Sequence, residues 1–313
     1  MEKNCIENIS DFLGSEDERY FSSGFKYVDV AYENLIYREK SLSGEVIVNS
    51  EWNKKTDKST HLGTVEYIAI ASSLCEQILK TKFYLSSQEI MSSWICYLKT
   101  KIQSCIDLTE NTVIHVSGKL ILTEKIQDTV NQYASSFEIR INNTLIKIRI
   151  NHPVSFWFKV TGGNPVEINK SGIYSIGYKD REHSIEHIFI DKETMKCTAS
   201  VSVRDKYHCK SGIGSKYQGM LITDIIIISG QLVQTLFYTI EQTSRRDAGN
   251  IWLKEFEVTI DNPESEMFYD AKLSFEDVKL LKKNDEIWKS VLFTSKLGKI
   301  YSSIKMVSKI NQK

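Results

Sequence analysis

The segment Ile68-Ala-Ile-Ala-Ser-Ser-Leu-Cys-Glu-Gln-Ile-Leu79 decides the fold, because Ile225-Ile-Ile-Ile-Ser-Gly-Gln-Leu-Val-Gln-Thr-Leu236 matches it without a gap. Ser72 pairs with Ser229 at a spacing of 157 residues (229 less 72), which is half of the 313 residues in the chain. We therefore interpret the chain as two copies of a unit of roughly 150 residues, each built on a strongly apolar helix.

Strand-like runs follow each helix at this spacing. Those at Thr112 to Leu122 and Phe137 to Ile150 map onto Tyr269 to Lys279 and Thr294 to Val307. A helix as apolar all round as residues 225–240 must be buried on every side, and a curved antiparallel sheet can enclose it. We predict an α+β fold, a tandem (double) hotdog, in which two antiparallel sheets each wrap a central apolar helix. The two halves would pair their sheets edge to edge, as an internal pseudo-dimer.

This interpretation divides the chain into four parts. They are an N-terminal cap segment (1–40), a first hotdog unit (41–155), a connector (156–170) and a second hotdog unit (171–313). The connector is predicted from its glycines and Pro165, which break regular structure. The sequence leaves open whether the pseudo-dimer forms a homodimer.

Composition excludes several classes of partner. Lys+Arg and Asp+Glu both count 40, so no excess of positive charge attracts nucleic acid or an anionic membrane. The first twenty residues are polar and acidic, unlike a signal peptide, and the apolar run that begins at Ile225 is too interrupted for a span of ~20 residues. Six cysteines without a CxxC pair favour free thiols in a reducing compartment, so we expect a cytoplasmic protein.

His61, immediately before the first helix, is the first candidate catalytic residue. A neutral imidazole there can act as a base, and exposed amides of the first helical turn can bind a carbonyl or oxyanion oxygen. The alternative is a histidine that only hydrogen-bonds a loop.

Asp224 is the second candidate, because it is the single acid in Leu221-Ile-Thr-Asp-Ile-Ile-Ile-Ile228. A carboxylate in such a run is either paired or has a raised pKa, which suggests function, whereas the alternative is a helix cap. At the repeat spacing Asp224 matches Tyr67 and His61 matches Gln218. We therefore predict a composite site across the pseudo-twofold axis, with a base from one half and an acid from the other.

Four further residues are candidates for substrate binding. Gln231 and Gln234 lie on the otherwise apolar second helix, where buried amides either bind substrate or tie the helix to the sheet. Gly214 belongs to a glycine-rich approach to that helix, which lets backbone amides come close to a substrate. Arg245, just beyond the helix, could hold a phosphate or carboxylate or lie in a solvated loop.

The segment His183-Ser-Ile-Glu186-His187 matches the H-x-x-E-H pattern of zinc peptidases, whose ligands must share one face of a helix. It continues into β-rich sequence, in which the glutamate does not share the face of the two histidines. We therefore predict no metal site here, and the acid–base chemistry considered for this chain requires no cofactor.

The chain resembles the avirulence D (AvrD-like) family of bacteria in motifs spread over nearly its whole length. The motifs are Asp11-Phe-Leu-Gly14, Arg19-Tyr-Phe-Ser-Ser-Gly24, Ser59-Thr-His61, Lys210-Ser-Gly-Ile-Gly214, Asp224, Gly230-Gln-Leu-Val-Gln234, Ser244-Arg245 and Asn250-Ile-Trp252. The last of these adds Trp252 to the substrate-binding candidates. More distantly the chain is similar to the A-factor biosynthesis proteins, which are also tandem hotdogs.

The resemblance implies a biosynthetic acyltransferase that joins a 3-oxoacyl chain to a ketose or keto-phosphate, giving an acyl-sugar signal of the syringolide type. The acyl chain would arrive as a thioester on an acyl carrier protein or coenzyme A. On this hypothesis His61 removes a proton from the acceptor, Asp224 relays a proton, and Gln231 and Gln234 orient the acyl carbonyls.

Two alternatives remain open from the sequence. One is a dehydratase or thioesterase on the same scaffold, although the HxxxGxxxxP and DxxxQ patterns of double-hotdog dehydratases are absent around His61 and Asp224. The other is an acyl-ligand-binding protein without catalysis.

Overall fold

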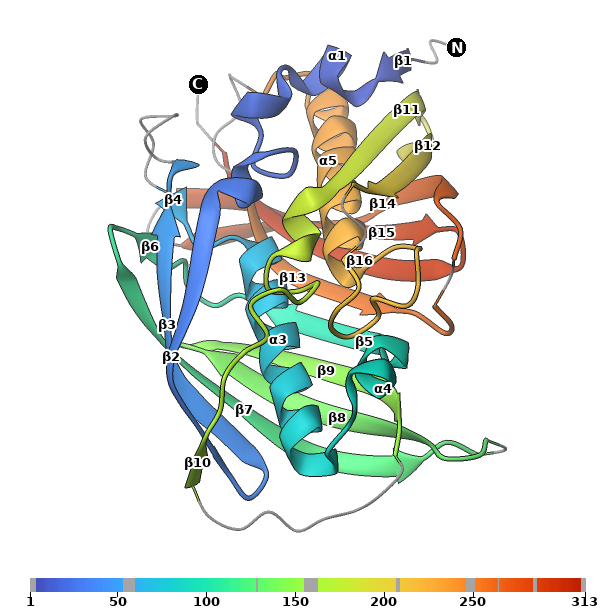
Figure 1. Cartoon of the computed structure of the whole chain (residues 1–313). Helices are drawn as coiled ribbons and strands as arrows, with labels where there is room; N and C mark the ends of the chain where they lie inside the picture. Colours follow the sequence, from blue (N-terminus) through green and yellow to red (C-terminus); the bar gives the residue numbers. More distant parts are fainter. Residues whose placement is uncertain are drawn as a thin grey trace.

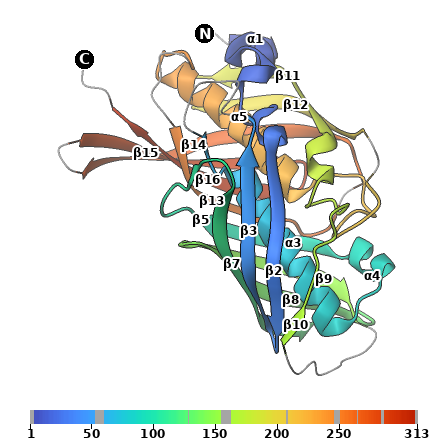
Figure 2. The same cartoon turned by 60° about the vertical axis from the view of Figure 1, so that its left-hand side comes forward.

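The computed structural model describes residues 4–52, 60–127, 129–154, 163–206, 209–245, 251–263, 265–283 and 286–310. Two long helices, α3 (Thr64–Phe83) and α5 (Ile222–Ile240), lie on the inner face of one curved antiparallel sheet (Figure 1). Almost every residue of both helices is buried, which confirms the two apolar core helices expected from the sequence. In the turned view of Figure 2, β2 and β3 cross over α3.

Each half of the chain contributes the same succession of strands to the sheet. In the first half these are β2 (Val28–Arg38), β3 (Ser41–Ser50), β5 (Trp94–Lys101), β7 (Thr112–Lys125), β8 (Gln132–Ile141) and β9 (Thr144–Pro153). In the second half they are β11 (Arg181–Asp191), β12 (Lys196–Asp205), β13 (Ile251–Thr259), β14 (Phe268–Lys283), β15 (Glu286–Leu297) and β16 (Ile300–Lys309). Helix α3 follows β3 as α5 follows β12, so the two halves share one topology.

The order of strands across the fourteen-stranded sheet is β1-β11-β12-β14-β15-β16-β13-β5-β9-β8-β7-β3-β2-β10. The two halves therefore appear in opposite order, as a pseudo-twofold axis between β13 and β5 requires. Lys99 of β5 lies opposite Glu257 of β13 and forms an ion pair with it at 2.7 Å. The expected edge-to-edge pairing of the two halves is confirmed, because β5 pairs antiparallel with β13 and the two predicted sheets thereby form one continuous sheet.

The segments that lead into the two halves meet at the centre of the molecule. The 3-10 turn η2 (Gly24–Tyr27) precedes β2, and η3 (Gly177–Asp180) precedes β11 at a spacing of 153 residues (177 less 24). Phe25 and Tyr178 hold equivalent positions in these turns, and their rings stack with centroids 6.2 Å apart. Each half thus begins beside the other, close to the starts of both central helices.

The N-terminal segment belongs to both halves of the sheet. Strand β1 (Asn4–Asn8) pairs with β11, and α1 (Ile9–Leu13) packs against α5. The short turn η1 (Glu16–Glu18) follows, and β2 already begins at Val28, inside the predicted cap of residues 1–40.

The structure describes only the later part of the predicted connector. Residues 155–162 lie outside the described residues, and β10 (Gly163–Pro165) pairs with β2 at the edge of the sheet. The remaining short elements are α4 (Ser87–Ser92) after α3, and a separate pair of strands, β4 (Thr60–His61) and β6 (Asp107–Leu108).

Helix α5 is long and apolar enough to cross a membrane by length and composition, yet 94% of the relevant stretch is buried inside the protein. A helix at the centre of a protein core has the same properties, and here the sheet of the second half covers it (Figure 1).

Candidate active site

His61 ends β4, directly before α3, and is held from two sides. Its Nδ1 atom pairs with Oδ1 of Asp107 on β6, and its side chain is 27% exposed. The ring of Trp252 lies against the imidazole, with centroids 4.9 Å apart and an angle of 52° between the planes. Trp252 comes from β13, so the structure brings two predicted site residues together from different halves of the chain.

The Asp107–His61 contact is an ion pair without hydrogen-bond geometry, since Nδ1 of His61 has no hydrogen-bond partner among the described residues, and the Asp107 side chain is 75% exposed. With Nδ1 directed to a carboxylate, Nε2 is the ring nitrogen that can take a proton from a substrate. Asp107 was not predicted from the sequence, because it lies 46 residues beyond His61 (107 less 61) in a segment without any motif. Only the pairing of β4 with β6 brings it close.

Glu66 and Tyr20 form a second polar pair at the start of α3. Glu66 is the third residue of the helix after its N-cap, Gly63, and is completely buried. The Tyr20 hydroxyl donates a hydrogen bond to Oε2 of Glu66 and occupies the space that a side chain at position 63 would need, so only glycine fits there. Burial raises the pKa of Glu66 to about 7, although the hydrogen bond from Tyr20 opposes the rise.

The first turn of α3 is covered by the protein. Thr64, Val65 and Glu66 are buried, and the Tyr20 hydroxyl and the Glu66 carboxyl fill the space beside Gly63. We expected the amides of this turn to be exposed and free to bind a substrate oxygen. That expectation is corrected, because the first turn is buried beneath Tyr20 and the Glu66 side chain.

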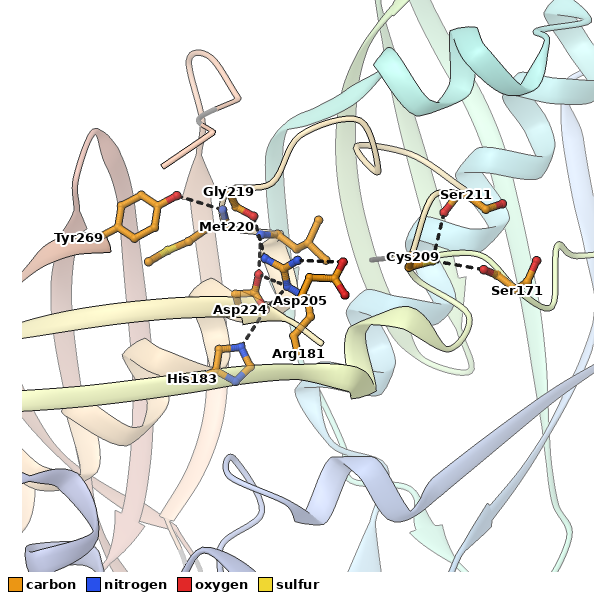
Figure 3. Close-up of polar contacts among 11 residues, drawn as sticks. Ser171, Arg181, His183, Asp205, Cys209, Ser211, Gly219, Met220, Asp224 and Tyr269 are labelled. Atoms are coloured by element: carbon orange, nitrogen blue, oxygen red, sulfur yellow. Dashed lines mark hydrogen bonds and ion pairs between the residues drawn. The ribbon is translucent and has the colours of Figure 1, made fainter. Parts of the chain in front are cut away.

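Asp224 is the third residue of α5 after its N-cap, Leu221, and is completely buried. Its carboxylate accepts hydrogen bonds from Arg181 Nε at 2.8 Å and from the Leu221 amide at 2.7 Å, and it pairs with His183 Nε2 at 2.8 Å (Figure 3). Burial alone would raise the pKa of Asp224, but Arg181 and His183 outweigh it and hold the pKa below its ordinary value. Of the two interpretations considered from the sequence, this geometry favours the paired helix cap.

The starts of the two helices are 158 residues apart, counted between the N-caps Gly63 and Leu221 (221 less 63). Asp224 therefore corresponds to Glu66 and not to Tyr67 as we had matched it. The match at 157 is dominated by apolar residues of the helix interiors, which carry little information on register. Both halves have kept a buried acid in the first turn of the central helix.

His61 and Asp224 lie at the starts of different helices. With the corrected register His61 corresponds to Gly219, whose carbonyl oxygen accepts a hydrogen bond from Arg181 Nη2 at 2.7 Å. His61 contacts Asp107 and Trp252, whereas Asp224 contacts residues of β11 and its own N-cap (Figure 3). Among the described contacts none joins the two candidates that we had expected to share one site.

A small cavity of about 30 Å³ lies at the start of α5, and Gly214 lines it as expected for a residue close to that helix. Trp94 of β5 also lines this cavity and stands edge-on to Tyr217 at 6.3 Å between centroids. Trp94 is the counterpart of Trp252 (252 less 94 is 158), so each helix start faces a tryptophan from the other half. The cavity at α5 has room for about one water molecule.

Two of the remaining predicted binding residues, Gln231 and Arg245, contact the N-terminal segment. Gln231 accepts a hydrogen bond from Arg19 Nη1 at 2.6 Å, and Arg245 donates to backbone carbonyls within residues 13–18. Gln234 also lies on α5 and is half-buried. For Gln231 this geometry favours the structural alternative, in which its side chain links α5 to the N-terminal segment.

The segment that matches the H-x-x-E-H pattern of zinc peptidases, residues 183–187, lies on strand β11 and not on a helix. His183 points into the Asp224 cluster, whereas the Glu186 side chain is exposed. His187 has a φ of 51° at a β-bulge, as Asn34 has a φ of 52° at the equivalent bulge of β2. The three side chains do not converge, and within the described parts of the chain no group of three or more His, Cys, Asp or Glu side chains could hold a metal ion.

Two copies of a helix enclosed by antiparallel strands, joined edge to edge, define a hotdog-like α+β protein. The chain belongs to the AvrD family, because the family model described as Pseudomonas avirulence D protein (AvrD) matches residues 4–300. The family resemblance inferred from the sequence motifs is thereby confirmed. No curated protein matches the chain.

Several solved structures are similar to the chain at low identity. The tesB protein of Mycobacterium avium subs paratuberculosis has 10% identity and a TM-score of 0.41, covering 88% of this chain and 96% of that chain. A hot dog protein of unknown function from Alicyclobacillus acidocaldarius has 6% identity and a TM-score of 0.38, with 94% and 99% covered. A bifunctional dehydratase-cyclase domain of ambruticin biosynthesis has 9% identity and a TM-score of 0.38, with 91% and 96% covered. With TM-scores this low, these likenesses support no inference about activity.

Proposed function

We propose that this protein is an enzyme that joins a 3-oxoacyl thioester to a small keto-sugar, giving an acyl-sugar signalling metabolite of the syringolide type. The observation that carries the proposal is the Asp107–His61 pair at the start of α3, covered by Trp252 from the other half. Membership of the AvrD family supports it, since the resemblance to that family implies this chemistry. The place of action would be the cytoplasm, where the thioesters of acyl carrier protein and coenzyme A are available.

The proposed reaction requires a base that deprotonates the sugar hydroxyl, followed by departure of the thiol from the thioester. His61 Nε2 takes the proton of a sugar hydroxyl as its oxygen attacks the thioester carbonyl carbon. The carbon–sulfur bond then breaks, sulfur keeps the electron pair, and protonation releases the thiol. The carbon between the two carbonyls of the resulting 3-oxoacyl ester is acidic, so it can add to the keto group of the sugar and close a ring.

The other residues of the site have supporting roles in this proposal. Asp107 keeps the imidazole oriented, and the indole of Trp252 gives the acceptor or the acyl chain an apolar face to pack on. Asp224 has a structural role in this proposal, as the buried cap of α5 that is paired with Arg181.

Product analysis tests the proposal. The purified protein is incubated with 3-oxoacyl thioesters, with and without ketoses and keto-phosphates, and all species are followed by mass spectrometry. The expected result is an acyl-sugar mass and free thiol that both require the acceptor. Free acid without an acceptor would instead indicate a thioesterase, and an acyl thioester that has lost water would indicate a dehydratase. Intact thioester with every acceptor, while the acyl chain stays bound, would make this a ligand-binding protein.

A further inference from the structure

A groove of about 550 Å³ lies on the outer face of the second half of the sheet. It is lined by residues of β11, β12, β14 and β15, which are neighbours in the sheet (Figure 1). Ala199 and Ala271 alternate with lining residues and are buried in the core against which α5 packs, so the lining side chains point away from that helix. The volume falls in the range of about 300–1,000 Å³ that is typical of sites for small molecules.

Serine side chains form the floor of the groove. Ser200 of β12 lies between Glu186 of β11 and Asp270 of β14 in the register of the strands. Ser202, the next outward residue of β12, lies beside Phe268, whose side chain is 76% exposed. Neighbouring strands are about 5 Å apart, so the small Ser200 side chain leaves a gap of about 10 Å between the backbones that carry Glu186 and Asp270.

The equivalent place in the first half is occupied by longer side chains. Strands β3 and β12 correspond at a spacing of 155 residues (196 less 41), so Glu45 and Ile47 take the places of Ser200 and Ser202. Glu45 reaches across to His115 of β7 and pairs with it at 3.4 Å. The groove therefore depends on two serines of the second half and is not a general property of this sheet.

The charged side chains of the groove stand in rows of one sign. Lys272 of β14 is directly opposite Lys296 of β15, and both side chains are exposed; they form a basic row. Two residues along β14, Asp270 and Glu186 lie on either side of Ser200 and form an acidic row. Like charges that stand directly opposite each other destabilise a sheet, so each row favours a group of opposite charge beside it.

No counter-charge for the two rows comes from the described parts of the chain. Glu186 accepts a hydrogen bond from the Ser184 hydroxyl at 2.6 Å, and Lys296 Nζ lies 5.1 Å from the centroid of the Tyr301 ring. Both of these partners are neutral, and none of the four charged side chains forms an ion pair with another described residue. The groove thus offers two carboxylates and two ammonium groups to a ligand.

We propose that this groove binds a small zwitterion of about the length of a dipeptide. The anionic group of the ligand lies between Lys272 and Lys296. Its ammonium group lies between Glu186 and Asp270. The two rows are two residues apart along β14, or about 7 Å, and an extended dipeptide spans about the same distance. The inference goes beyond the proposed function and does not rest on it, because the groove shares no residue with the His61 site.

The arrangement of charges disfavours ligands of other classes. A simple anion near the lysines would also lie near the carboxylates of Glu186, Asp270 and Glu266, and a simple cation near these carboxylates would lie near the lysines. An apolar ligand would cover charged groups and hydroxyls without giving them partners. Phe268 offers an apolar ring beyond the acidic row, so a dipeptide whose first side chain is aromatic can pack on it.

Binding measurements with a series of blocked ligands test the proposal. Ligand-observed NMR titrations compare phenylalanylglycine with its N-acetyl derivative and its C-terminal amide on the wild-type protein. Because each blocked derivative lacks one of the two charges, we expect the unmodified dipeptide to bind about 3- to 10-fold more tightly than either. Equal affinity of the three compounds, or no binding of the dipeptide at millimolar concentration, would overturn the proposal.

Two substitutions assign the charges of the ligand to the two rows. Asp270→Asn should weaken binding of the dipeptide and of its amide, which both carry the ammonium group, but not of the acetyl derivative. Lys272→Met should weaken binding of the dipeptide and of the acetyl derivative, but not of the amide. Because Lys272→Met removes an exposed like-charge contact, urea unfolding should show this variant to be at least as stable as the wild type. The same loss for all three compounds in both variants would overturn the assignment.

A substitution that fills the floor of the groove locates the ligand. Ser200→Gln gives this position the length of its counterpart Glu45 without the charge, and should abolish dipeptide binding by occupying the gap. Ser117→Gln on β7, in the first half, is the matched control and should bind the dipeptide as the wild type does. Undiminished binding by Ser200→Gln would overturn the proposal, because the ligand would then lie outside the groove.

Discussion

Glu66 of α3 and Asp224 of α5 stand at the same position of two equivalent helices, yet among the described residues Asp224 is paired with an arginine and Glu66 is not. Burial raises the pKa of Glu66 against the hydrogen bond from Tyr20, whereas Arg181 and His183 lower the pKa of Asp224. Both halves thus have an acid at the same capping position, but the charged partners of the two acids differ. Strand β11 places Arg181 and His183 beside Asp224. The difference has consequences for stability that can be measured.

The stability of the protein should depend on the ionisation of Glu66. Its folded-state pKa, about 7, lies above the ordinary value of 4.5, so the folded protein holds a proton that the unfolded chain releases. The contribution of the neutral acid is fully present below about pH 4.5 and is lost as pH rises through 7. The free energy of unfolding of the wild type relative to Glu66→Gln should fall by about 3 kcal/mol between pH 4 and pH 8. Urea unfolding at several pH values measures this, and a difference that is constant with pH would contradict it.

Asp224→Asn should destabilise the protein strongly. The substitution leaves the buried Arg181 with Asp205, at 3.8 Å, as its remaining carboxylate among the described residues, and breaking a buried ion pair in this way costs about 3–5 kcal/mol. Because the folded-state pKa of Asp224 is lowered, its contribution is present above the ordinary value of 3.8 and disappears as pH falls below that value. Thermal unfolding at pH 7 and pH 3 checks both points. A stable variant that has lost only activity would restore Asp224 as a catalytic candidate.

Gln231 should act with Arg19 as a structural tie. The hydrogen bond between them joins α5 to the N-terminal segment and involves a buried guanidinium. In a double-mutant cycle with Arg19→Met and Gln231→Leu, we expect a coupling of about 1.5–3 kcal/mol in the free energy of unfolding. If Gln231 bound the acyl chain, its substitution would instead raise KM while the stability changes of the two variants simply added.

Trp252 on β13 and Trp94 on β5, the two strands that join the halves, allow a controlled test of substrate binding. Trp252 lies against His61, whereas its counterpart Trp94 faces the small cavity at α5. Loss of an aromatic contact worth about 0.5–1.5 kcal/mol corresponds to a roughly 2- to 10-fold weaker use of substrate. Steady-state kinetics should show that loss in kcat/KM for Trp252→Ala and not for Trp94→Ala. An equal effect of both variants would place the substrate elsewhere.

The fold could be predicted from the sequence because its decisive signal is local. The apolar runs at 68–79 and 225–236 predict two buried helices. Because similar strands follow each helix, few fold architectures are compatible with the sequence. The edge-to-edge joining of the halves was expected from the hotdog pattern, but the strands that join them were not predicted. They are β5 and β13, whose sequences carry no pattern that marks them as partners.

The candidate site was less predictable for physical reasons. An acid in the first turn of a helix, such as Glu66, looks like any cap, and its environment depends on Tyr20, 46 residues earlier (66 less 20). Arg181 and His183 lie in a β-rich segment, in which the pattern we recognised was a zinc motif. Because that segment is a strand and not a helix, the motif was misleading and gave no hint of the Asp224 cluster. A slip of one residue in matching the repeats then paired Asp224 with Tyr67 and hid the equivalence of the two acids.

The most direct test of the central claim compares His61→Ala with His115→Ala in the acyl-sugar assay. His115 lies on β7 with its side chain 83% exposed, so its loss controls for the removal of an imidazole. If His61 is the base, acceptor-dependent product formation falls at least about 100-fold in His61→Ala and stays at the wild-type rate in His115→Ala. Equal rates of acyl-sugar formation in His61→Ala and the wild type would contradict the account.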